Sequence, residues 1–237
     1  MYSGGIAGYA LSSKITNCYS TGNIASLGAS SSYLYIPNSY SGGIAGYVTN
    51  STITGSYSVG EISASASNSS NNSGSNAIAY SGGITGYAVS GTTITESYST
   101  GDVSASSSSP VTSTSYSGGI SGYVSSATRV TITRCAAINK MIGAQNYVGR
   151  IVGYITGTVS ISNNFALSTM AATGAVFNTT DTRYNGASRT DAQLRTRSTY
   201  EDAIYGDGDG GLGWSFGSNE TNPWKMPSSG YPIFYWQ

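Results

Sequence analysis

Apolar and polar residues alternate over short segments of this chain, and glycine separates one segment from the next. Segments 52–54, 93–95 and 131–133 each read Thr-Ile-Thr, which places one apolar side chain between two hydroxyl groups. A period of two with β-branched residues, interrupted by frequent turn residues, is typical of β-strands. Residues that favour helices are scarce before position 185, so we expect a helix only within segment 188–206.

The alternating segments belong to a longer internal repeat. The motif Tyr-Ser-Gly-Gly-Ile-x-Gly-Tyr starts at Tyr2, Tyr40, Tyr80 and Tyr116, and a degraded copy, YVGRIVGY, starts at Tyr147. Short strands and glycine turns at such a period predict coils that stack about 4.8 Å apart. We therefore expect an all-β protein: a right-handed parallel β-helix, or β-solenoid, of about five or more coils over residues 1–174.

Stacking of the repeats would place equivalent residues in columns. Isoleucines would form two interior columns, Ile6, Ile44, Ile84, Ile120 and Ile151, and Ile15, Ile53, Ile94, Ile132 and Ile161. Glycines would mark one corner, where only glycine fits or where backbones approach closely: Gly8, Gly46, Gly86, Gly122 and Gly153. Segments 25–39, 63–79 and 104–115, which are rich in serine and nearly uncharged, are expected to bulge from one side as variable loops.

Tyrosines would stack in three ladders, two of them at the ends of the repeated motif. The ladders are Tyr2, Tyr40, Tyr80, Tyr116 and Tyr147; Tyr9, Tyr47, Tyr87, Tyr123 and Tyr154; and Tyr19, Tyr57 and Tyr98, which Ala136 and Phe165 continue. Stacked aromatic side chains stabilise neighbouring strands, and this alone could explain the ladders. An exposed strip of tyrosines could also bind sugar rings or a protein, because tyrosine offers contact area at low entropic cost. The five residues from Tyr9 to Tyr154 are the candidate ligand contacts.

Two cysteines test the proposed register. Cys18 and Cys135 occupy the same repeat position, with Ser56 and Ser97 between them. Three coils at about 4.8 Å would separate them by roughly 14 Å, twice the distance over which a disulfide can form. We expect two unpaired thiols in positions that suit small residues.

The composition changes after about residue 175, where charged residues and all three tryptophans, Trp214, Trp224 and Trp236, are found. Because the end of a solenoid exposes strand edges and apolar core, we expect residues 175–237 to form a mixed capping segment packed on the last coil. A binding patch built from the tryptophans is the alternative. Asp207 and Asp209, in a glycine-rich run, are expected to form a turn rather than a calcium loop, which needs about six oxygens.

Composition excludes several functions. The chain has 10 basic and 10 acidic residues and no histidine. Without histidine there is no Ser-His-Asp triad, no Cys-His pair and no histidine-bound metal, and so few basic residues argue against nucleic-acid binding. We expect no cofactor.

No apolar run is long enough to span a membrane, and Met1 precedes the first repeat directly, without a signal peptide. The first coil is therefore expected to continue into a longer chain or to self-associate, since an open edge is adhesive.

The repeats resemble a known family. The first three repeats are similar to the GLUG-motif repeats of bacterial surface proteins: GGIAGY followed by ITNCYSTGNI, GGIAGY by ITGSYSVGEI, and GGITGY by ITESYSTGDV. The end of the chain is similar to the segment that often closes such arrays, with the strings RTDAQLRTRSTY, GWSF, NPW and YPIFYWQ. The family has Leu-Val where this chain has Ile-Ala, Ile-Thr or Ile-Ser, and Arg150 replaces a glycine in the fifth copy. The resemblance implies an extracellular or cell-surface β-helix in a bacterium and implies no enzymatic activity.

Two alternative functions would use residues outside the tyrosine ladders. Parallel β-helices include lyases and hydrolases of carbohydrates, which need clustered carboxylates, and Glu61 and Asp102 occupy equivalent repeat positions that could lie one coil apart. The Thr-Ile-Thr segments could also form two outward columns of hydroxyl groups, an arrangement associated with ice-binding solenoids, although Lys14 interrupts it. The residues and the resemblance favour a non-catalytic adhesion or structural module that binds a glycan or a host or cell-surface protein through the tyrosine ladders or the serine-rich loops.

Overall fold

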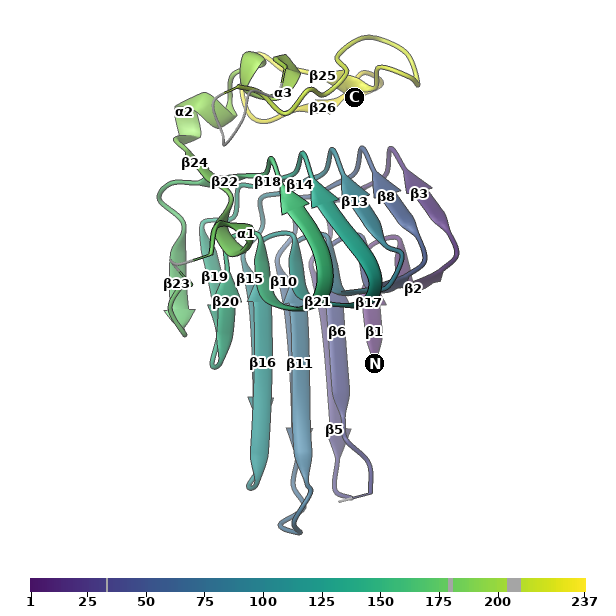
Figure 1. Ribbon diagram of the computed structural model, residues 1–237, viewed down its shortest axis with the longest axis vertical. Coiled ribbons are helices and arrows are strands. Elements are labelled where there is room, and N and C mark those ends of the chain that lie inside the picture. Colours follow the sequence, from purple (N-terminus) through teal and green to yellow (C-terminus); the bar gives the residue numbers. More distant parts are fainter. Residues whose placement is uncertain (33, 179–180, 204–209) are drawn as a thin grey trace.

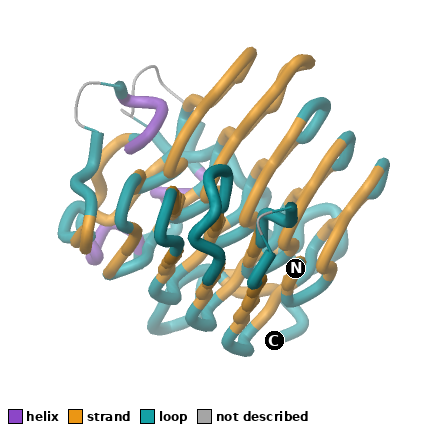
Figure 2. Tube along the Cα trace, turned by 90° about the horizontal axis from the view of Figure 1, so that it is seen from below, coloured by secondary structure: helices purple, strands orange, loops and turns teal. Residues whose placement is uncertain are grey.

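The computed structural model describes residues 1–32, 34–178, 181–203 and 210–237, and it shows a β-solenoid of stacked parallel strands (Figure 1). Each coil passes through four sheets, and Figure 2 shows the successive coils as parallel rows. Sheet A contains β1 (Tyr2–Gly4), β6 (Asn38–Gly42), β11 (Asn76–Gly82), β16 (Thr112–Gly118) and β20 (Tyr147–Gly149). Sheet B contains β2 (Ala7–Leu11), β7 (Ala45–Thr49), β12 (Thr85–Val89), β3 (Lys14–Thr16), β8 (Thr52–Thr54), β13 (Thr93–Thr95), β17 (Ser121–Thr133) and β21 (Val152–Ser162).

The other two sheets complete the coil. Sheet C contains β4 (Tyr19–Ser20), β9 (Tyr57–Ser58), β14 (Tyr98–Ser99), β18 (Ala136–Ala137), β22 (Phe165–Leu167) and β24 (Ala187–Arg189). Sheet D contains β5 (Ile24–Ser30), β10 (Ile62–Asn68), β15 (Val103–Ser108), β19 (Met141–Ala144) and β23 (Ala171–Gly174). The predicted all-β solenoid is confirmed, and so is its register, since Tyr40 pairs with Tyr2 on one side and with Tyr80 on the other.

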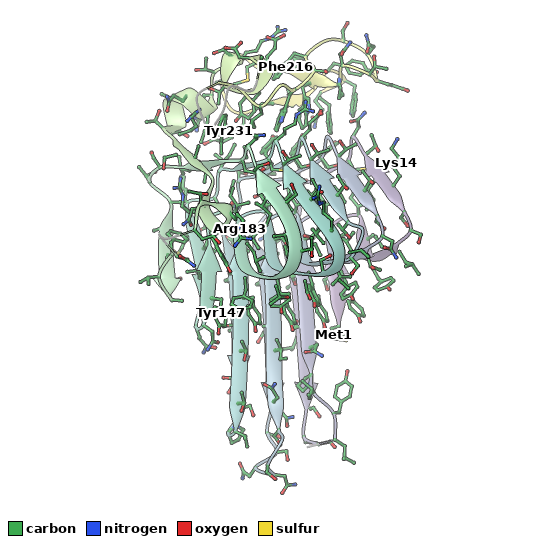
Figure 3. The ribbon with its side chains drawn as sticks, viewed as in Figure 1. Met1, Lys14, Tyr147, Arg183, Phe216 and Tyr231 are labelled. Carbon is green, nitrogen blue, oxygen red and sulfur yellow. The ribbon has the colours of Figure 1, made fainter. Side chains whose placement is uncertain are left out.

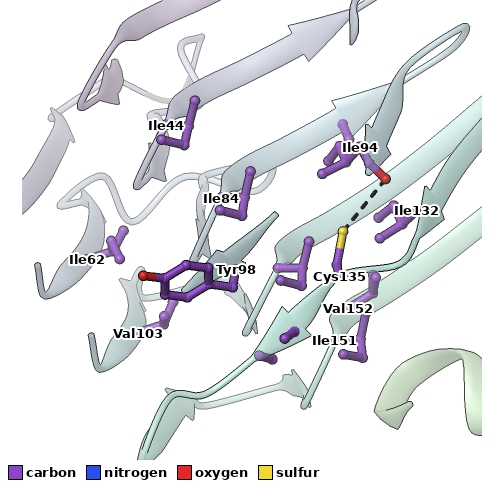
Figure 4. Close-up of a cluster of buried hydrophobic side chains, with 14 of the residues drawn as sticks. Ile44, Ile62, Ile84, Ile94, Tyr98, Val103, Ile132, Cys135, Ile151 and Val152 are labelled. Carbon is purple, nitrogen blue, oxygen red and sulfur yellow. Dashed lines mark hydrogen bonds between the residues drawn. The ribbon is translucent and has the colours of Figure 1, made fainter. Parts of the chain in front are cut away.

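The isoleucine columns lie in the interior as predicted (Figure 4). In the column that begins at Ile6, the N–H of each of the first four isoleucines donates to the carbonyl of the next one, for example Ile44 to Ile84 at 3.0 Å. Figure 4 shows Ile44, Ile84 and Ile151 of this column among the buried side chains. Ile44 is 0% exposed, whereas Ile6 is 46% exposed, because the described chain places no coil over the first one. The first coil is thus an open end with exposed apolar side chains.

The corner glycines are required by close backbone approach, one of the two reasons foreseen. A Cβ atom on Gly86 would lie 2.7 Å from the carbonyl oxygen of Gly46, and one on Gly46 would lie 2.7 Å from that of Gly8. Neither contact can be relieved by a side-chain movement, because both atoms belong to the backbone.

The serine-rich segments project from one side of the solenoid as expected (Figure 1), but the expectation that they are loops was wrong, because most of their residues lie in strands. Their strands in sheets A and D pack face to face and extend beyond the body of the solenoid as a two-layered fin, residues 24–42, 62–82 and 103–118 of the described chain (Figure 1). Alternate residues of β10 face inward, and Ala64 and Ala66 are buried. The buried Ser41 hydroxyl donates to Ser26 Oγ at 2.7 Å. Small residues let the two sheets approach, and the hydrogen bond between Ser41 and Ser26 joins the two layers.

The position of the C-terminal segment also differs from the expectation. Only its first part lies on the last coil, where β24 extends sheet C and Arg150 donates to Ser188 Oγ. The rest returns along the side of the solenoid toward the first coil, where Asn17 Nδ2 donates to the Glu220 carbonyl at 3.2 Å. The segment runs along the top of the view in Figure 1 and contains the antiparallel pair β25 (Trp224–Lys225) and β26 (Ile233–Phe234).

Helical structure in this segment is shorter than expected. The described part of segment 188–206 holds two single-turn helices, α2 (Asp191–Leu194) and α3 (Ser198–Glu201), and α1 (Thr182–Asn185) was not foreseen. Thr190 caps α2: its hydroxyl accepts from the Gln193 N–H at 3.2 Å, and the Gln193 side chain accepts in return from the Thr190 N–H. None of the helices in the described residues is long and apolar enough to cross a membrane.

Candidate functional site: rows of stacked tyrosines

The candidate ligand contacts stand in one row on sheet B. Tyr9 stacks on Tyr47 with ring centroids 5.2 Å apart, and Tyr47, Tyr87 and Tyr123 then meet edge to face at 5.2 and 4.8 Å. Tyr154 completes the row by stacking on Tyr123 at 5.5 Å. The structure thus brings all five predicted residues together, and we call them the sheet B row.

A second row on sheet A lies directly beside the first. It consists of the tyrosines that open each motif: Tyr2, Tyr40, Tyr80, Tyr116 and Tyr147. Neighbours within this row are stacked nearly parallel, as Tyr40 and Tyr80 are at 4.8 Å and 1°. The two rows touch edge to face, for example at 5.6 Å between Tyr40 and Tyr47. The glycine-containing turn between the two tyrosines of each motif is what brings them side by side at the corner, where Figure 3 labels Tyr147.

The two rows differ in exposure. In the first coil Tyr2 and Tyr9 are both about half exposed, at 50% and 48%, because no described coil covers them. In the middle of the rows Tyr40 and Tyr80 are buried, whereas Tyr47 and Tyr87 are partly exposed. Burial first, and then the neighbouring tyrosines, raise the pKa of Tyr116 to about 12. The Tyr123 hydroxyl lies 3.2 Å from Thr156 Oγ1 in the next coil. The sheet B row therefore presents rings that are held in place by their neighbours and remain open along the outer side.

The third ladder, on sheet C, is covered at Tyr57 and Tyr98, whereas Tyr19 in the first coil is 40% exposed. We call Tyr19, Tyr57 and Tyr98 the sheet C row; Tyr57 and Tyr98 stack at 4.8 Å. Tyr98 is 2% exposed, lies 5.9 Å from the ring of Trp224, and donates its hydroxyl to the Pro232 carbonyl at 2.6 Å. For this row the structural interpretation of the ladders is confirmed, because its rings form the floor on which the C-terminal segment packs.

The carboxylates of the enzymatic alternative lie on successive coils, as their repeat positions indicated. Ile62, which follows Glu61, pairs with Val103, which follows Asp102. Both acidic residues are exposed, and Asp102 Oδ1 accepts the Met141 N–H of the next coil at 3.1 Å. This contact gives Asp102 a structural role between coils.

The hydroxyl columns are also in register. Thr93 and Thr95 pair with Thr52 and Thr54 on one side and with their counterparts in β17 on the other. Their side chains are half-buried, and the array ends at Lys14 in the first coil and at serines in the fifth. Threonine occupies both positions in only three coils.

Both thiols are free, as predicted, and they replace serine in a repeated hydrogen-bond pattern. Ser97 Oγ accepts the Ser56 N–H at 3.2 Å and donates to the Thr95 carbonyl at 2.8 Å. Cys135 Sγ likewise donates to the carbonyl two residues before it, that of Thr133, at 3.3 Å. Burial raises the pKa of the Cys135 thiol to about 12, which makes it an unreactive structural residue.

Metal binding finds no support in the described ranges. Between residues 1 and 203 without 33 and 179–180, and from 210 onward, no three His, Cys, Asp or Glu side chains could together hold an ion. Asp207 and Asp209 lie outside the described residues.

Two features of the site escaped the sequence interpretation. The fin could have been found from the period-two pattern of its small residues, as in the segment 62–68, where Ile, Ala, Ala and Asn face inward. The cover over the sheet C row could not have been found, because nothing in the sequence around Tyr57 or Tyr98 distinguishes these residues from the exposed tyrosines.

Comparisons with known proteins agree with this architecture. The model of the GLUG motif family matches residues 1–25. A putative immunoglobulin A1 protease from Bacteroides ovatus has a similar solved structure, with a TM-score of 0.55 and 24% identity over 94% of this chain. The chain spans 58% of that protein's length. No curated protein matches the sequence.

Proposed function

We propose that this chain is a non-catalytic adhesion or structural module on the outside of a bacterium, and that it binds a glycan or a host or cell-surface protein through the sheet B row. The observation that carries the proposal is that Tyr57 and Tyr98 of the sheet C row are buried under the chain's own C-terminal segment, whereas all five tyrosines of the sheet B row are exposed or partly exposed. Stacking on sheet A and between coils already fixes the rings, so that binding would cost little side-chain entropy.

The extracellular location rests on the GLUG motif and on the solenoid fold. The motif matches at the first repeat, and the similar solved structure comes from a bacterium. Protease activity belongs to the name of that protein, and a likeness of fold does not bring it to this chain. The exposed carboxylates of Glu61 and Asp102 add nothing that favours catalysis here.

The open face of the first coil supplies a second contact surface in this proposal. Ile6, Leu11 and Leu27 are exposed there, beside strand edges that no described strand pairs. The partner would be another coil, either of a longer chain or of a second copy. Light scattering on the chain and on its Leu11→Lys variant tests self-association: we expect concentration-dependent dimers that the variant abolishes, and monomers at all concentrations would leave only the first option.

A binding screen tests the main proposal. Wild-type protein is applied to arrays of glycans and of matrix proteins, together with the variant Tyr47→Ala/Tyr87→Ala and the control Tyr35→Ala, which removes an exposed tyrosine of the fin. We expect binding by wild type and control and its loss in the double variant, with thermal unfolding showing that each protein is folded. Equal binding by all three proteins, or no binding by wild type, contradicts the proposal.

A further inference from the structure

The end of the chain forms a small cleft with the first coil. Its volume is about 420 Å³, and it is lined by Thr16, Asn17, Glu220, Tyr235 and Trp236. Two of the three tryptophans have no share in it: Trp214 and Trp224 are buried and stack on each other at 4.7 Å. Trp236 is 48% exposed, so burial of the C-terminal segment does not account for its presence.

Trp236 is one of two aromatic walls. One side of its indole stacks on Phe234, with centroids 4.5 Å apart and an angle of 18° between the planes. The ring of Tyr235 stands at 88° to it, 4.9 Å away. About half of the Trp236 surface thus remains exposed, and this ring and Tyr235 both line the cleft.

The aromatic platform, which consists of Trp236 and Phe234, is held in place by contacts deeper in the molecule. Phe234 is fully buried and packs 5.3 Å from the ring of Tyr57. The side-chain oxygen of Gln237 accepts from the Phe234 N–H at 2.9 Å and from the Tyr57 hydroxyl at 2.7 Å. These bonds hold the residues on both sides of Trp236, so a ligand would meet a preformed surface.

The opposite side of the cleft is polar. Asn17 lies in a tight turn, with a φ of 53°, and its amide binds the Glu220 carbonyl, which ties the C-terminal segment to the first coil. The Glu220 side chain is exposed, and among the described residues its carboxylate forms no ion pair. Thr16 adds an exposed hydroxyl group.

We propose that this cleft binds an uncharged pyranose residue of a glycan. A pyranose carries C–H groups on one face, which pack against the electron-rich face of an indole, and hydroxyl groups at its rim, which donate to carboxylates and bond to amides. A carboxylate disfavours anionic sugars, and the volume suits one or two rings. The site is independent of the sheet B row and uses none of its residues.

Saturation-transfer NMR with methyl glycosides of glucose, galactose, mannose and N-acetylglucosamine tests the proposal. We expect at least one to bind with a Kd on the order of 1 mM, and Trp236→Ala to weaken binding by about tenfold or more. Glu220→Gln removes the carboxylate charge from the exposed rim without touching the aromatic platform, and should weaken binding by a smaller factor. Lys225→Ala, an exposed change in the same segment, is the matched control.

Each outcome decides one question. Binding that Trp236→Ala and Glu220→Gln leave unchanged overturns this proposal, and so does the absence of binding by any of the four glycosides at about 10 mM, ten times the expected Kd. Loss of glycan binding in Tyr47→Ala/Tyr87→Ala but not in Trp236→Ala would support the sheet B row and contradict the cleft. The reverse result would support the cleft and contradict glycan binding by the sheet B row.

Discussion

The sheet C row and the sheet B row are built from the same residue at the same spacing, yet they have different surroundings. In both, tyrosines of successive coils lie about 5 Å apart because parallel coils repeat at that distance. Tyr98 is covered by tryptophan and proline from the end of the chain, whereas Tyr87, in the same repeat, remains partly exposed. Stacking is therefore a property of the repeat, and the function of a ladder depends on what covers it.

The largest difference in stability between the two rows is expected when one aromatic ring is removed. Tyr98→Ala should lower the free energy of unfolding by about 3–5 kcal/mol, the cost of deleting a fully buried aromatic side chain. Tyr9→Ala should cost about 1 kcal/mol, since mainly ring–ring contacts are lost. Chemical denaturation measures both values. Equal losses would mean that the C-terminal segment does not cover the sheet C row.

A smaller loss of stability is expected at alkaline pH, and it involves tyrosines of both the sheet A and the sheet C rows. The pKa of a tyrosine in an unfolded chain is about 10. Burial raises the pKa of native Tyr116 to about 12, and burial also raises that of Tyr98 well above its ordinary value. The folded state thus keeps the hydroxyl protons more tightly. The associated stability is complete below about pH 10 and is lost as the pH rises through about 12.

Denaturation midpoints at a series of pH values measure this loss. Tyr116→Phe, which has no hydroxyl proton at that position, should lose less stability than wild type over the same interval, with a series at neutral pH as the reference. A wild-type midpoint that stays constant to pH 12 would contradict the burial of these tyrosines.

The smallest effect is expected for removal of a single hydroxyl. Tyr98→Phe leaves the Pro232 carbonyl without its donor and should cost about 1–2 kcal/mol. Tyr9→Phe removes an exposed hydroxyl and should change stability by less than about 0.5 kcal/mol. If Tyr9→Phe proved as destabilising as Tyr98→Phe, the sheet B row would have a buried polar partner and would not be open.

The sequence allowed the solenoid and its columns to be predicted because they depend only on local periodicity. The isoleucine columns, the glycine corner and the free thiols all follow from one register, which the pairing of Tyr40 with Tyr2 and Tyr80 confirms. The fin was missed because serine and alanine carry weak strand signals, and only tertiary packing of small side chains turns them into a two-layered structure.

The course of the C-terminal segment could not be predicted for a different reason. It depends on contacts between residues more than 130 positions apart, such as Tyr98 with Pro232, and no local pattern encodes them. The same limitation applies to the cleft, whose walls come from residues 16–17 and 220–236. Trp236 had no sequence feature that distinguished it from the two buried tryptophans.

Residue-resolved chemical modification of tyrosine, read by mass spectrometry on the native protein, tests the difference between the rows most directly. We expect the exposed residues Tyr2, Tyr9, Tyr19 and Tyr147 to be modified rapidly. The partly exposed Tyr47 and Tyr87 of the sheet B row should also be modified in the native protein, and Tyr57 and Tyr98 of the sheet C row only after unfolding. Rapid native-state modification of Tyr98, or protection of Tyr9 in the isolated monomer, would contradict the assignment of one row to structure and the other to binding.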